Sequence, residues 1–525
     1  MSNFLLSIIS FFLYVILKYR KSFYALQQNS YNANHQYIKW VFKNPRKTFL
    51  TYELLFAAIA VGIYYLTKRV ILLTLVFYLF SFILELLKIK KEQHKKKFVF
   101  TKRVFRLTCT TTVILGVLLA GIIYYFDEKY VMYYYLALFL FGYLSFIIAT
   151  IINIMNVPFE RIVYLYYRTK AVNKLKSIPG LKVIGITGSY GKTSSKNILN
   201  AILQTSFNCY PSPKSFNTPY GLMNAINNGL DKFDEIFIAE MGAVHLRDIK
   251  ILTDLVHPKY GIITTIGVAH LETFKTEENI QKGKFQLIEN LPSDGVGVLN
   301  MDDPKQVSYK IKNNCKIIWI AIDNKDADYV ATNIKLSGEG TTFDVKINDK
   351  IYNFKTVLLG KHNIYNILAS IALGVELGVD PNKLALAIQG LKPIEHRLEL
   401  KKYGNINIID DAFNSNPVGS KMALEVLSYM DGKKIVVTPG MIELGPKEYE
   451  YNFKFGEYIS EVCDEVILIG EKQTKPIYDG LINKNYDKKK IHILNDVKLA
   501  FPLIRELKGD YILLENDLPD IFSEV

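Results

Sequence analysis

The hydrophobic pattern divides the chain into two contrasting parts. Long apolar runs occupy residues 3–17, 49–67, 70–87, 104–126 and 131–155. Each approaches or exceeds the roughly 20 residues that a helix needs to cross a bilayer, so we predict five transmembrane helices within residues 1–156. The first run is the weakest of the five, because it is short and an uncleaved signal-like segment would have the same pattern.

Loop charge predicts the orientation of these helices. The loops at 18–47 and 88–106 hold seven and nine Lys and Arg residues, whereas the other two loops hold three in all. Because basic loops stay in the cytoplasm, we expect the N-terminus outside and everything after residue 156 inside. This predicts a multi-pass cell-membrane protein whose lysine cluster at 95–97 meets anionic membrane lipid.

The rest of the chain has a different pattern. Beyond a basic connector, expected to be helical, at 157–180, short β-branched runs alternate with helical stretches at 182–187, 236–239, 260–265, 296–300 and 317–322. A second series follows at 406–409, 434–438, 465–469, 490–494 and 511–514. This alternation predicts mainly parallel sheets in two α/β domains, 181–392 and 393–525.

Charge and cysteine usage narrow the classes of partner. The net charge is +14, but residues 1–176 hold 24 Lys and Arg against 6 Asp and Glu, and the remainder holds 40 against 44. The basic residues therefore belong to the predicted membrane region, which argues against nucleic acid as a partner. The four cysteines lie far apart without a CxxC pair, so we expect no zinc cluster and no disulfide framework.

One segment has the pattern of a phosphate-binding loop. The sequence ITGSYGKTS at 186–194 follows an apolar strand and precedes a predicted helix at 195–203. Its glycines let backbone N–H groups approach phosphate oxygens, and the helix N-terminus adds positive charge. Lys192 can reach the terminal phosphates and the Thr193 hydroxyl can bind magnesium. The segment predicts a P-loop ATPase domain, although Ile186 stands where the general pattern has its first glycine.

Two further side chains end strands near this loop. Glu240 offers carboxylate oxygens of the kind that magnesium prefers, with a helix-capping role as the alternative. His270 also follows a strand, and from the residues alone a structural role is as good an interpretation as metal binding. Cations here would neutralise the charge that develops during phosphoryl transfer.

Four segments further along the chain join the glycine-rich loop in a fixed order. They read AEMGA at 239–243, IGVAHLE at 266–272, GKHNIYN at 360–366 and DDAFNSNP at 410–417. Together the five segments resemble the Mur ligase family, ATP-dependent amide-bond ligases of cell-wall precursor synthesis, and most closely its MurF branch, which adds D-alanyl-D-alanine. The resemblance covers nearly all of the chain from residue 182 and implies an acid–amino-acid ligase with a Rossmann-like C-terminal domain.

The resemblance also implies an ATP site. Its residues would be Gly188, Ser189, Tyr190, Gly191, Lys192, Thr193, Ser194, Asn363, Asn366, Arg397 and Asp411. Asn363 and Asn366 would contact adenine or position its loop, although Asn at a helix start is also an ordinary cap. Arg397 would reach phosphate and Asp411 would reach ribose when the last domain closes on the site.

A metal site and a modified lysine follow from the same resemblance. Two magnesium ions would be bound by Thr193, Glu240, His270 and Lys284, and the catalytic residues would be Lys192, Glu240, His270 and Lys284. Lys284 matches the position at which the family carbamylates a lysine with carbon dioxide, creating an anionic magnesium ligand. An unmodified surface lysine is the alternative.

The substrates are less well defined. SPKSFNTPYG at 212–221 resembles the family's acceptor loop, and we expect substrate contacts at Ser215, Asn217, Thr218, Asn414 and Asn416. Predicted membrane helices stand where the MurF branch has its uridine-nucleotide domain. LENDLP at 514–519 replaces a basic segment of that branch. The sequence therefore supports the ATP chemistry better than the identity of either substrate.

Four functions are compatible with these features. We expect a membrane-anchored ligase that joins an amino acid or D-Ala-D-Ala to a cell-wall precursor, either nucleotide-linked or lipid-linked. A ligase for another polymer such as poly-γ-glutamate, an ATPase-coupled transporter and an inactive membrane scaffold are the alternatives. The near absence of charge within the spans argues against a transporter, and the complete set of expected catalytic residues argues against a scaffold.

Overall fold

The computed structural model divides into two compact units, Met1–Leu165 and Tyr166–Val525. It describes residues 2–29, 31, 37–49, 51–67, 78–79, 82–83, 85–87, 98–125, 127–404, 406–412, 415–442 and 444–516. The division falls inside one helix, α9 (Val157–Lys176). The connector expected at 157–180 is therefore helical as far as Lys176.

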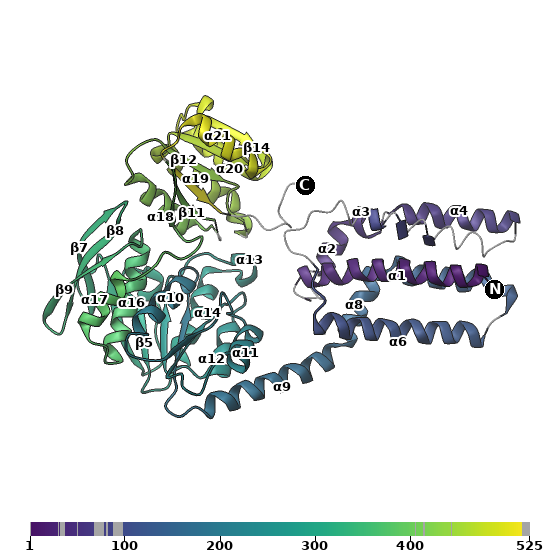
Figure 1. Ribbon diagram of the computed structural model, residues 1–525, viewed down its shortest axis with the longest axis horizontal. Coiled ribbons are helices and arrows are strands. Elements are labelled where there is room, and N and C mark those ends of the chain that lie inside the picture. Colours follow the sequence, from purple (N-terminus) through teal and green to yellow (C-terminus); the bar gives the residue numbers. More distant parts are fainter. Residues whose placement is uncertain are drawn as a thin grey trace. The chain divides into compact units, whose positions relative to one another are not determined.

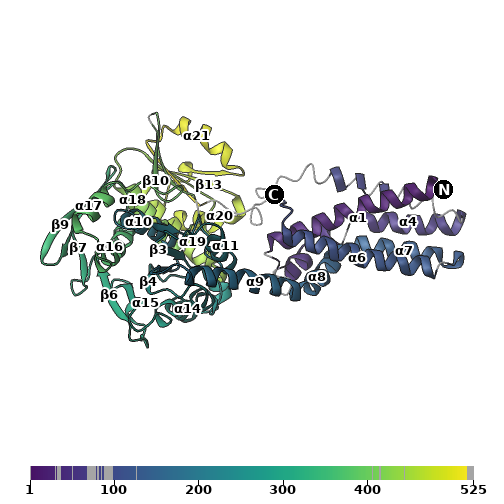
Figure 2. The ribbon, with the colours of Figure 1, turned by 60° about the horizontal axis from the view of Figure 1, so that its bottom comes forward.

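The first unit is helical throughout its described residues (Figure 1). Its elements are α1 (Ser2–Gln28), α2 (Ile38–Lys43), α3 (Pro45–Thr48), α4 (Tyr52–Thr67), α6 (Lys102–Tyr124), η2 (Glu128–Tyr130), α7 (Val131–Tyr143) and α8 (Ser145–Met155). Helices α1, α4 and α6 run alongside one another in both ribbon views (Figures 1 and 2). Aromatic side chains of α1 pack against α7 and α8 and form the core of this unit.

Fewer helices than expected have the length to cross a membrane. Within the described residues α6 is long and apolar enough, and α7 with α8 would make a second span although a 74° bend separates them. Helix α4 is apolar but shorter. The predicted helix at 70–87 lies mostly outside the described residues, and so does the lysine cluster at 95–97. The five-helix membrane bundle is therefore not confirmed.

The first helix also differs from its prediction. It continues beyond the apolar run, so Lys18 and Lys21, which we assigned to a loop, are helical. Lys18 Nζ lies 2.9 Å from the Glu53 carboxylate, which also accepts a hydrogen bond from Tyr14. Lys21 pairs with Glu85 at 3.5 Å, and both glutamates are buried. These two ion pairs were not predicted, because each joins residues far apart in the sequence. Within each pair the opposite charges compensate one another.

The second unit contains two sheets, of which the larger has nine strands in the order β2-β3-β1-β4-β5-β6-β7-β8-β9. These are β1 (Lys182–Thr187), β2 (Cys209–Pro211), β3 (Ile236–Glu240), β4 (Tyr260–Ile263), β5 (Val296–Asn300), β6 (Lys316–Ala321), β7 (Tyr329–Ser337), β8 (Gly340–Ile347) and β9 (Lys350–Thr356). Strands β1 to β6 are parallel, as predicted. The antiparallel extension formed by β7 to β9 was not expected.

Helices cover both faces of this sheet (Figure 2). One face carries α10 (Lys192–Leu203), α16 (Lys361–Glu376) and α17 (Pro381–Gln389), and the other carries α12 (Asp248–Val256) and α14 (Glu277–Glu289). Short helices complete the connections: α11 (Pro219–Asn228), α13 (Leu271–Phe274) and α15 (Pro304–Val307). Strands β3 and β5 are buried at every residue, as doubly covered parallel strands require. The carboxyl ends of β1, β3, β4 and β5 meet at one edge.

The smaller sheet belongs to the C-terminal domain and confirms a second α/β layer structure. Its order is β10-β11-β15-β12-β13-β14, with only β10 antiparallel to its neighbour. The strands are β10 (Glu399–Tyr403), β11 (Ile406–Asp411), β12 (Lys434–Thr438), β13 (Glu465–Ile469), β14 (Ile491–Leu494) and β15 (Tyr511–Glu515). The helical elements are α18 (Pro417–Ser428), η3 (Gly445–Lys447), α19 (Glu448–Val462), α20 (Glu471–Asn483), η4 (Lys488–Lys490), η5 (Val497–Leu499) and α21 (Ala500–Leu507).

Candidate active site

The glycine-rich loop joins β1 to α10 at the carboxyl edge of the larger sheet. Gly191 has φ +78°, and a Cβ on Gly188 would collide with the side chain of Thr264, so both positions need glycine. Lys192 Nζ donates to the carbonyl oxygens of Gly188 and Ser189, at 2.9 and 3.1 Å. The lysine is thus folded over the loop, and burial lowers its pKa to about 8.

Glu240, the last residue of β3, is the centre of a hydrogen-bond cluster. Its Oε2 accepts from Thr193 Oγ1 and Lys196 Nζ, both at 3.0 Å, and its Oε1 accepts from Asn217 Nδ2 at 3.0 Å. Its backbone N–H donates to Ser212 Oγ at 3.1 Å. The structure therefore brings two predicted metal ligands, Thr193 and Glu240, into direct contact.

His270 and Lys284 lie close enough to Lys192 for their charges to interact. Burial and the charge of Lys192 hold the pKa of Lys284 well below its usual range. Burial, with the charges of Lys284 and Lys192, lowers the pKa of His270 to about 4. His270 is therefore a neutral imidazole at neutral pH, the form that binds metals. Lys284 Nζ donates to the Ala243 carbonyl at 3.4 Å.

The predicted magnesium ligands are of different chemical types. In the described part of the chain no three His, Cys, Asp or Glu side chains gather into a metal cluster. A magnesium ion at the loop would therefore depend on the Glu240 carboxylate with the Thr193 hydroxyl, His270 and a modified Lys284. Oε2 of Glu240 already accepts two hydrogen bonds, whereas Oε1 accepts one and keeps a lone pair for a cation.

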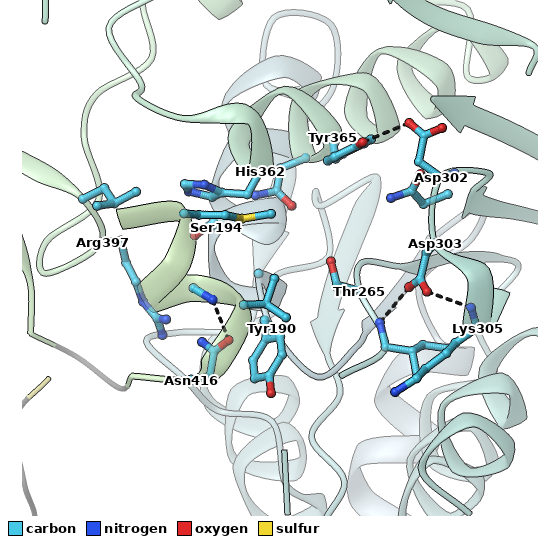
Figure 3. A pocket seen from close by; sticks show the side chains of 18 of the residues that line it. Tyr190, Ser194, Thr265, Asp302, Asp303, Lys305, His362, Tyr365, Arg397 and Asn416 are labelled. Atoms are coloured by element: carbon cyan, nitrogen blue, oxygen red, sulfur yellow. Dashed lines mark hydrogen bonds between the residues drawn. The ribbon is translucent and has the colours of Figure 1, made fainter. Parts of the chain in front are cut away.

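A cavity of about 410 Å³ opens beside the loop (Figure 3). This volume lies within the roughly 300 to 1,000 Å³ of small-molecule sites. The predicted ATP residues on its wall are Tyr190, Gly191, Ser194, Asn366, Arg397 and Asp411. Figure 3 shows Arg397 and Asn416 on one side of the view and Asp302 and Lys305 on the other, with Tyr190 between them. The middle and C-terminal domains therefore build the cavity together.

The two predicted adenine residues have different positions. Asn366 lines the cavity, and its Oδ1 accepts a hydrogen bond from Ser195 Oγ at 2.7 Å. Asn363 lies behind it, where its Nδ2 donates to the Leu359 carbonyl at 2.9 Å and its Oδ1 accepts from Asn366. The structure therefore gives Asn363 the supporting position rather than a place on the cavity wall.

The predicted substrate residues do not all lie together. Asn217 contacts Glu240, Thr218 caps α11 by accepting from the Gly221 N–H at 3.2 Å, and Ser215 lies in a turn of the same loop. Asn416 caps α18 and lines the cavity that holds the predicted ATP residues. Asn414 lies outside the described residues. The structure thus groups Asn416 with the nucleotide residues instead of the acceptor loop.

Sequence reasoning missed several residues on the cavity wall, among them Asp302, His362 and Tyr365. Asp302 follows β5, and its carboxylate accepts from Tyr365 OH at 2.9 Å. Although burial raises the pKa of Asp302, hydrogen bonds from backbone N–H groups and Tyr365 keep it below its usual value. His362 has a buried Nδ1 to which the described residues offer no hydrogen-bond partner, and burial lowers its pKa to about 4. The strand-end position of Asp302 was a usable signal.

The acidic segment near the C-terminus lies against Asp411. Glu515 pairs with Asp411 on the neighbouring strand and is fully buried. Its Oε1 accepts from Ser415 Oγ at 2.6 Å. Burial raises the pKa of Asp411 to about 6 although Arg397 lies beside it. Burial and the charge of Asp411 raise the pKa of Glu515 well above its usual range.

Comparison with known proteins identifies the family. The Mur ligase middle domain matches residues 186–374, and the Mur ligase, glutamate ligase domain matches residues 396–515. The chain is 32% identical over 343 residues to the UDP-N-acetylmuramoyl-tripeptide--D-alanyl-D-alanine ligase of Bacillus subtilis, a match that covers 64% of this chain and 73% of that protein. The chain belongs to the Mur ligase family. Mur ligases are acid–amino-acid ligases that use ATP and magnesium, so the prediction of a ligase is confirmed.

Solved structures agree with this assignment. The MurF ligase from Thermotoga maritima in complex with ADP is 26% identical, with a TM-score of 0.61 and coverage of 69% of this chain and 82% of that chain. MurF from Acinetobacter baumannii is 22% identical with a TM-score of 0.61, covering 68% and 78%, which shows the likeness of the fold. The first unit, Met1–Leu165, lies outside both matched domains.

Proposed function

We propose that this Mur ligase is a membrane-anchored enzyme of the MurF type, which joins D-alanyl-D-alanine or a related amine to the peptide carboxylate of a cell-wall precursor. The observation that carries the proposal is the meeting of Lys192, Glu240, His270 and Lys284 at one sheet edge. The likeness to the Bacillus subtilis ligase supports the choice of substrates.

The proposed reaction has two balanced steps. A carboxylate oxygen of the acceptor attacks the γ-phosphorus of ATP, which gives an acyl phosphate and ADP. The amine then attacks the carbonyl carbon, expels phosphate and loses one proton. Lys192 supplies positive charge to the phosphoryl group as it moves, and Arg397 adds charge from the C-terminal domain. Magnesium would supply further neutralisation, bound by Thr193, Glu240 and His270.

We further propose that Lys284 acts as a carbamate. Its lowered pKa favours the neutral amine, which adds to carbon dioxide and releases one proton to form the anionic carbamate. The carbamate would carry two oxygens close to His270, and oxygen is the ligand that magnesium prefers. The unmodified ammonium would instead repel a cation at the same place.

The first unit is proposed to anchor the ligase domains on the cytoplasmic side of the cell membrane. The apolar helix α6 and the basic loops of the sequence support this arrangement. An anchored ligase would have access to a lipid-linked acceptor as well as to the nucleotide-linked precursor. Reporters fused after Val525 and inserted between Asp127 and Tyr130 test this topology, because the proposal requires them on opposite sides of the membrane.

The activity is tested with the full chain purified in detergent. ATP and D-Ala-D-Ala are supplied with either UDP-muramoyl-tripeptide or the corresponding lipid-linked tripeptide, and product mass and ADP release are measured. The proposal expects an amide product with at least one acceptor, and none from the Lys192→Ala variant. ADP release without any amide product from either acceptor would overturn the choice of substrates.

A further inference from the structure

Lys196 has a position that neither the phosphate loop nor the expected metal site explains. It lies on α10, one turn after Lys192, and is 1% exposed. Its ammonium group contacts two oxygens, the Glu240 carboxylate at 3.0 Å and the backbone carbonyl of Lys214. A buried ammonium group needs such partners, because an unpaired charge in the protein interior is costly.

These two contacts join different parts of the site. Glu240 belongs to the rigid end of β3, whereas Lys214 lies within the loop that resembles the acceptor loop of the family. Both flanks of this loop are held to β3, since Ser212 N–H donates to the Ile238 carbonyl and Gly242 N–H donates to the Asn217 carbonyl, each at 2.8 Å. Lys196 reaches the stretch between these flanks.

We propose that Lys196 is a positioning residue that holds the acceptor loop, residues 212–217, against Glu240 and so determines the affinity for the acceptor. This proposal depends on the proposed function only for the identity of the acceptor that the loop binds. The Lys214 side chain is exposed and only its carbonyl faces Lys196. Side-chain identity at position 214 is therefore not required for the link.

The charge of Lys196 gives the proposal a second consequence. Lys196 neutralises Glu240 and also repels any cation that approaches this carboxylate. Loss of the lysine charge is therefore expected to lower one affinity without lowering the other. The affinity for the acceptor falls because the loop loses its tie, whereas the affinity for a divalent cation stays the same or rises.

Three variants test this pair of effects. Lys196→Met keeps the aliphatic stem without the charge, Lys196→Arg keeps the charge, and Lys250→Ala is the control, because it removes an exposed lysine of α12 outside the site. With UDP-muramoyl-tripeptide as acceptor, Lys196→Met is expected to raise the acceptor KM about tenfold, the effect of losing one charged hydrogen bond. The KM for ATP should not change. Lys196→Arg should restore part of the acceptor affinity, and Lys250→Ala should behave as the wild type.

Two readouts need no acceptor and so separate this proposal from the proposed function. Hydrogen exchange of the amides at 212–217 should quicken in Lys196→Met relative to the wild type and Lys250→Ala. Mn²⁺ binding, followed by electron paramagnetic resonance, should be unchanged or tighter. Unchanged exchange of the loop, or weaker Mn²⁺ binding, would overturn the proposal. If Lys196→Met fails to fold, Lys196→Arg is used in its place. The proposal then expects loop exchange faster than in the wild type and an unchanged KM for ATP. Loop exchange no faster than in the wild type, together with a raised KM for ATP, would contradict the assigned role.

Discussion

Each unit of the chain contains a lysine–glutamate pair in which both side chains are almost completely buried, and these two pairs have nearly the same geometry. Lys18 lies 2.9 Å from Glu53 and Lys196 lies 3.0 Å from Glu240, and none of the four side chains is more than 6% exposed. Removing two charges from water costs about as much in one unit as in the other. Geometry alone therefore does not distinguish them.

The surroundings of the two carboxylates do distinguish them. Glu53 lies in the first turn of α4 and receives one further hydrogen bond, from Tyr14, so the pair connects two helices. Glu240 ends a parallel strand beside the phosphate loop and receives hydrogen bonds from Thr193 and Asn217. Ligands in open α/β sheets bind at this edge of the sheet. A buried ion pair thus indicates function through its place in the topology rather than through its own strength.

The largest expected effect comes from breaking the pair in the first unit. Lys18→Met leaves the Glu53 carboxylate buried without its partner, which is expected to cost about 3 to 5 kcal/mol in the free energy of unfolding. The double variant Lys18→Met/Glu53→Leu removes both charges and should recover most of this loss. Thermal unfolding of the full chain in detergent, followed by the helical signal, measures both. Equal stability of the single and double variants would contradict the ion pair.

The second-largest effect is expected at the phosphate loop of the second unit. Lys192→Ala removes the charge nearest the phosphates and should raise the activation free energy by about 2.7 to 4 kcal/mol, or 100- to 1000-fold in kcat. The far-ultraviolet circular dichroism should not change. Lys250→Ala, which removes an exposed lysine on α12, is the control. Near-normal ligation by Lys192→Ala would show that the loop is misassigned.

Strands that form continuous apolar runs in the sequence were predicted well. The bounds of β1, β5, β12 and β13 agree with the prediction to the residue, because each is a continuous apolar run between turn residues. The extension β7 to β9 was missed because β7 has one buried residue and β9 has two, so neither contains a continuous apolar run. These strands are stabilised by pairing with β8 between them, which a search for apolar runs does not detect.

The same distinction applies to the site. The phosphate loop is local, so a short motif was sufficient to find it. Asp302 and Tyr365 meet across 63 residues of sequence, and Lys18 and Glu53 meet across 35. Gly142 near the end of α7 also lies against the ring of Tyr14 in α1, where a Cβ would collide with it. Such contacts require the packed structure.

The third effect concerns the modification proposed for Lys284. Lys284→Ala should lower kcat about 10- to 100-fold, the usual cost of disturbing the groups around a metal. Added short carboxylates should restore part of the activity by occupying the vacated anionic position. Wild-type activity should also fall in carbonate-stripped buffer. Equal wild-type activity with and without carbonate, and no rescue of the variant, would leave Lys284 as an unmodified buried lysine.

The fourth effect follows from the pKa of Lys192, which burial lowers to about 8. The ammonium form exists below this pKa, so a reaction that needs the charge loses activity as the pH rises through about 8. Because kcat/KM for ATP reports the free enzyme, it should fall by about tenfold per pH unit above that value. A flat profile up to the ordinary lysine range would show that phosphate binding does not depend on this charge.

The smallest effect is expected at a partly exposed cluster of one glutamate and two lysines, which joins the two domains of the second unit. Glu277 accepts hydrogen bonds from Lys305 Nζ at 2.6 Å and from Lys447 Nζ at 3.1 Å, with Lys447 in the C-terminal domain. These hydrogen bonds lower the pKa of Glu277. A lowered folded-state pKa means that the stabilisation is present at neutral pH and is lost as the pH falls through that pKa.

Solvent screens this cluster, so Glu277→Gln should lower the free energy of unfolding at neutral pH by only about 0.2 to 1 kcal/mol. Denaturant titrations of both proteins at neutral pH should show this difference, which should shrink in high salt. It should vanish below the ordinary glutamate range, where the wild-type carboxyl is also neutral. Lys447→Met should remove only the interdomain part. A difference that persists in acid would mean that packing, rather than charge, distinguishes Glu277 from the two buried glutamates.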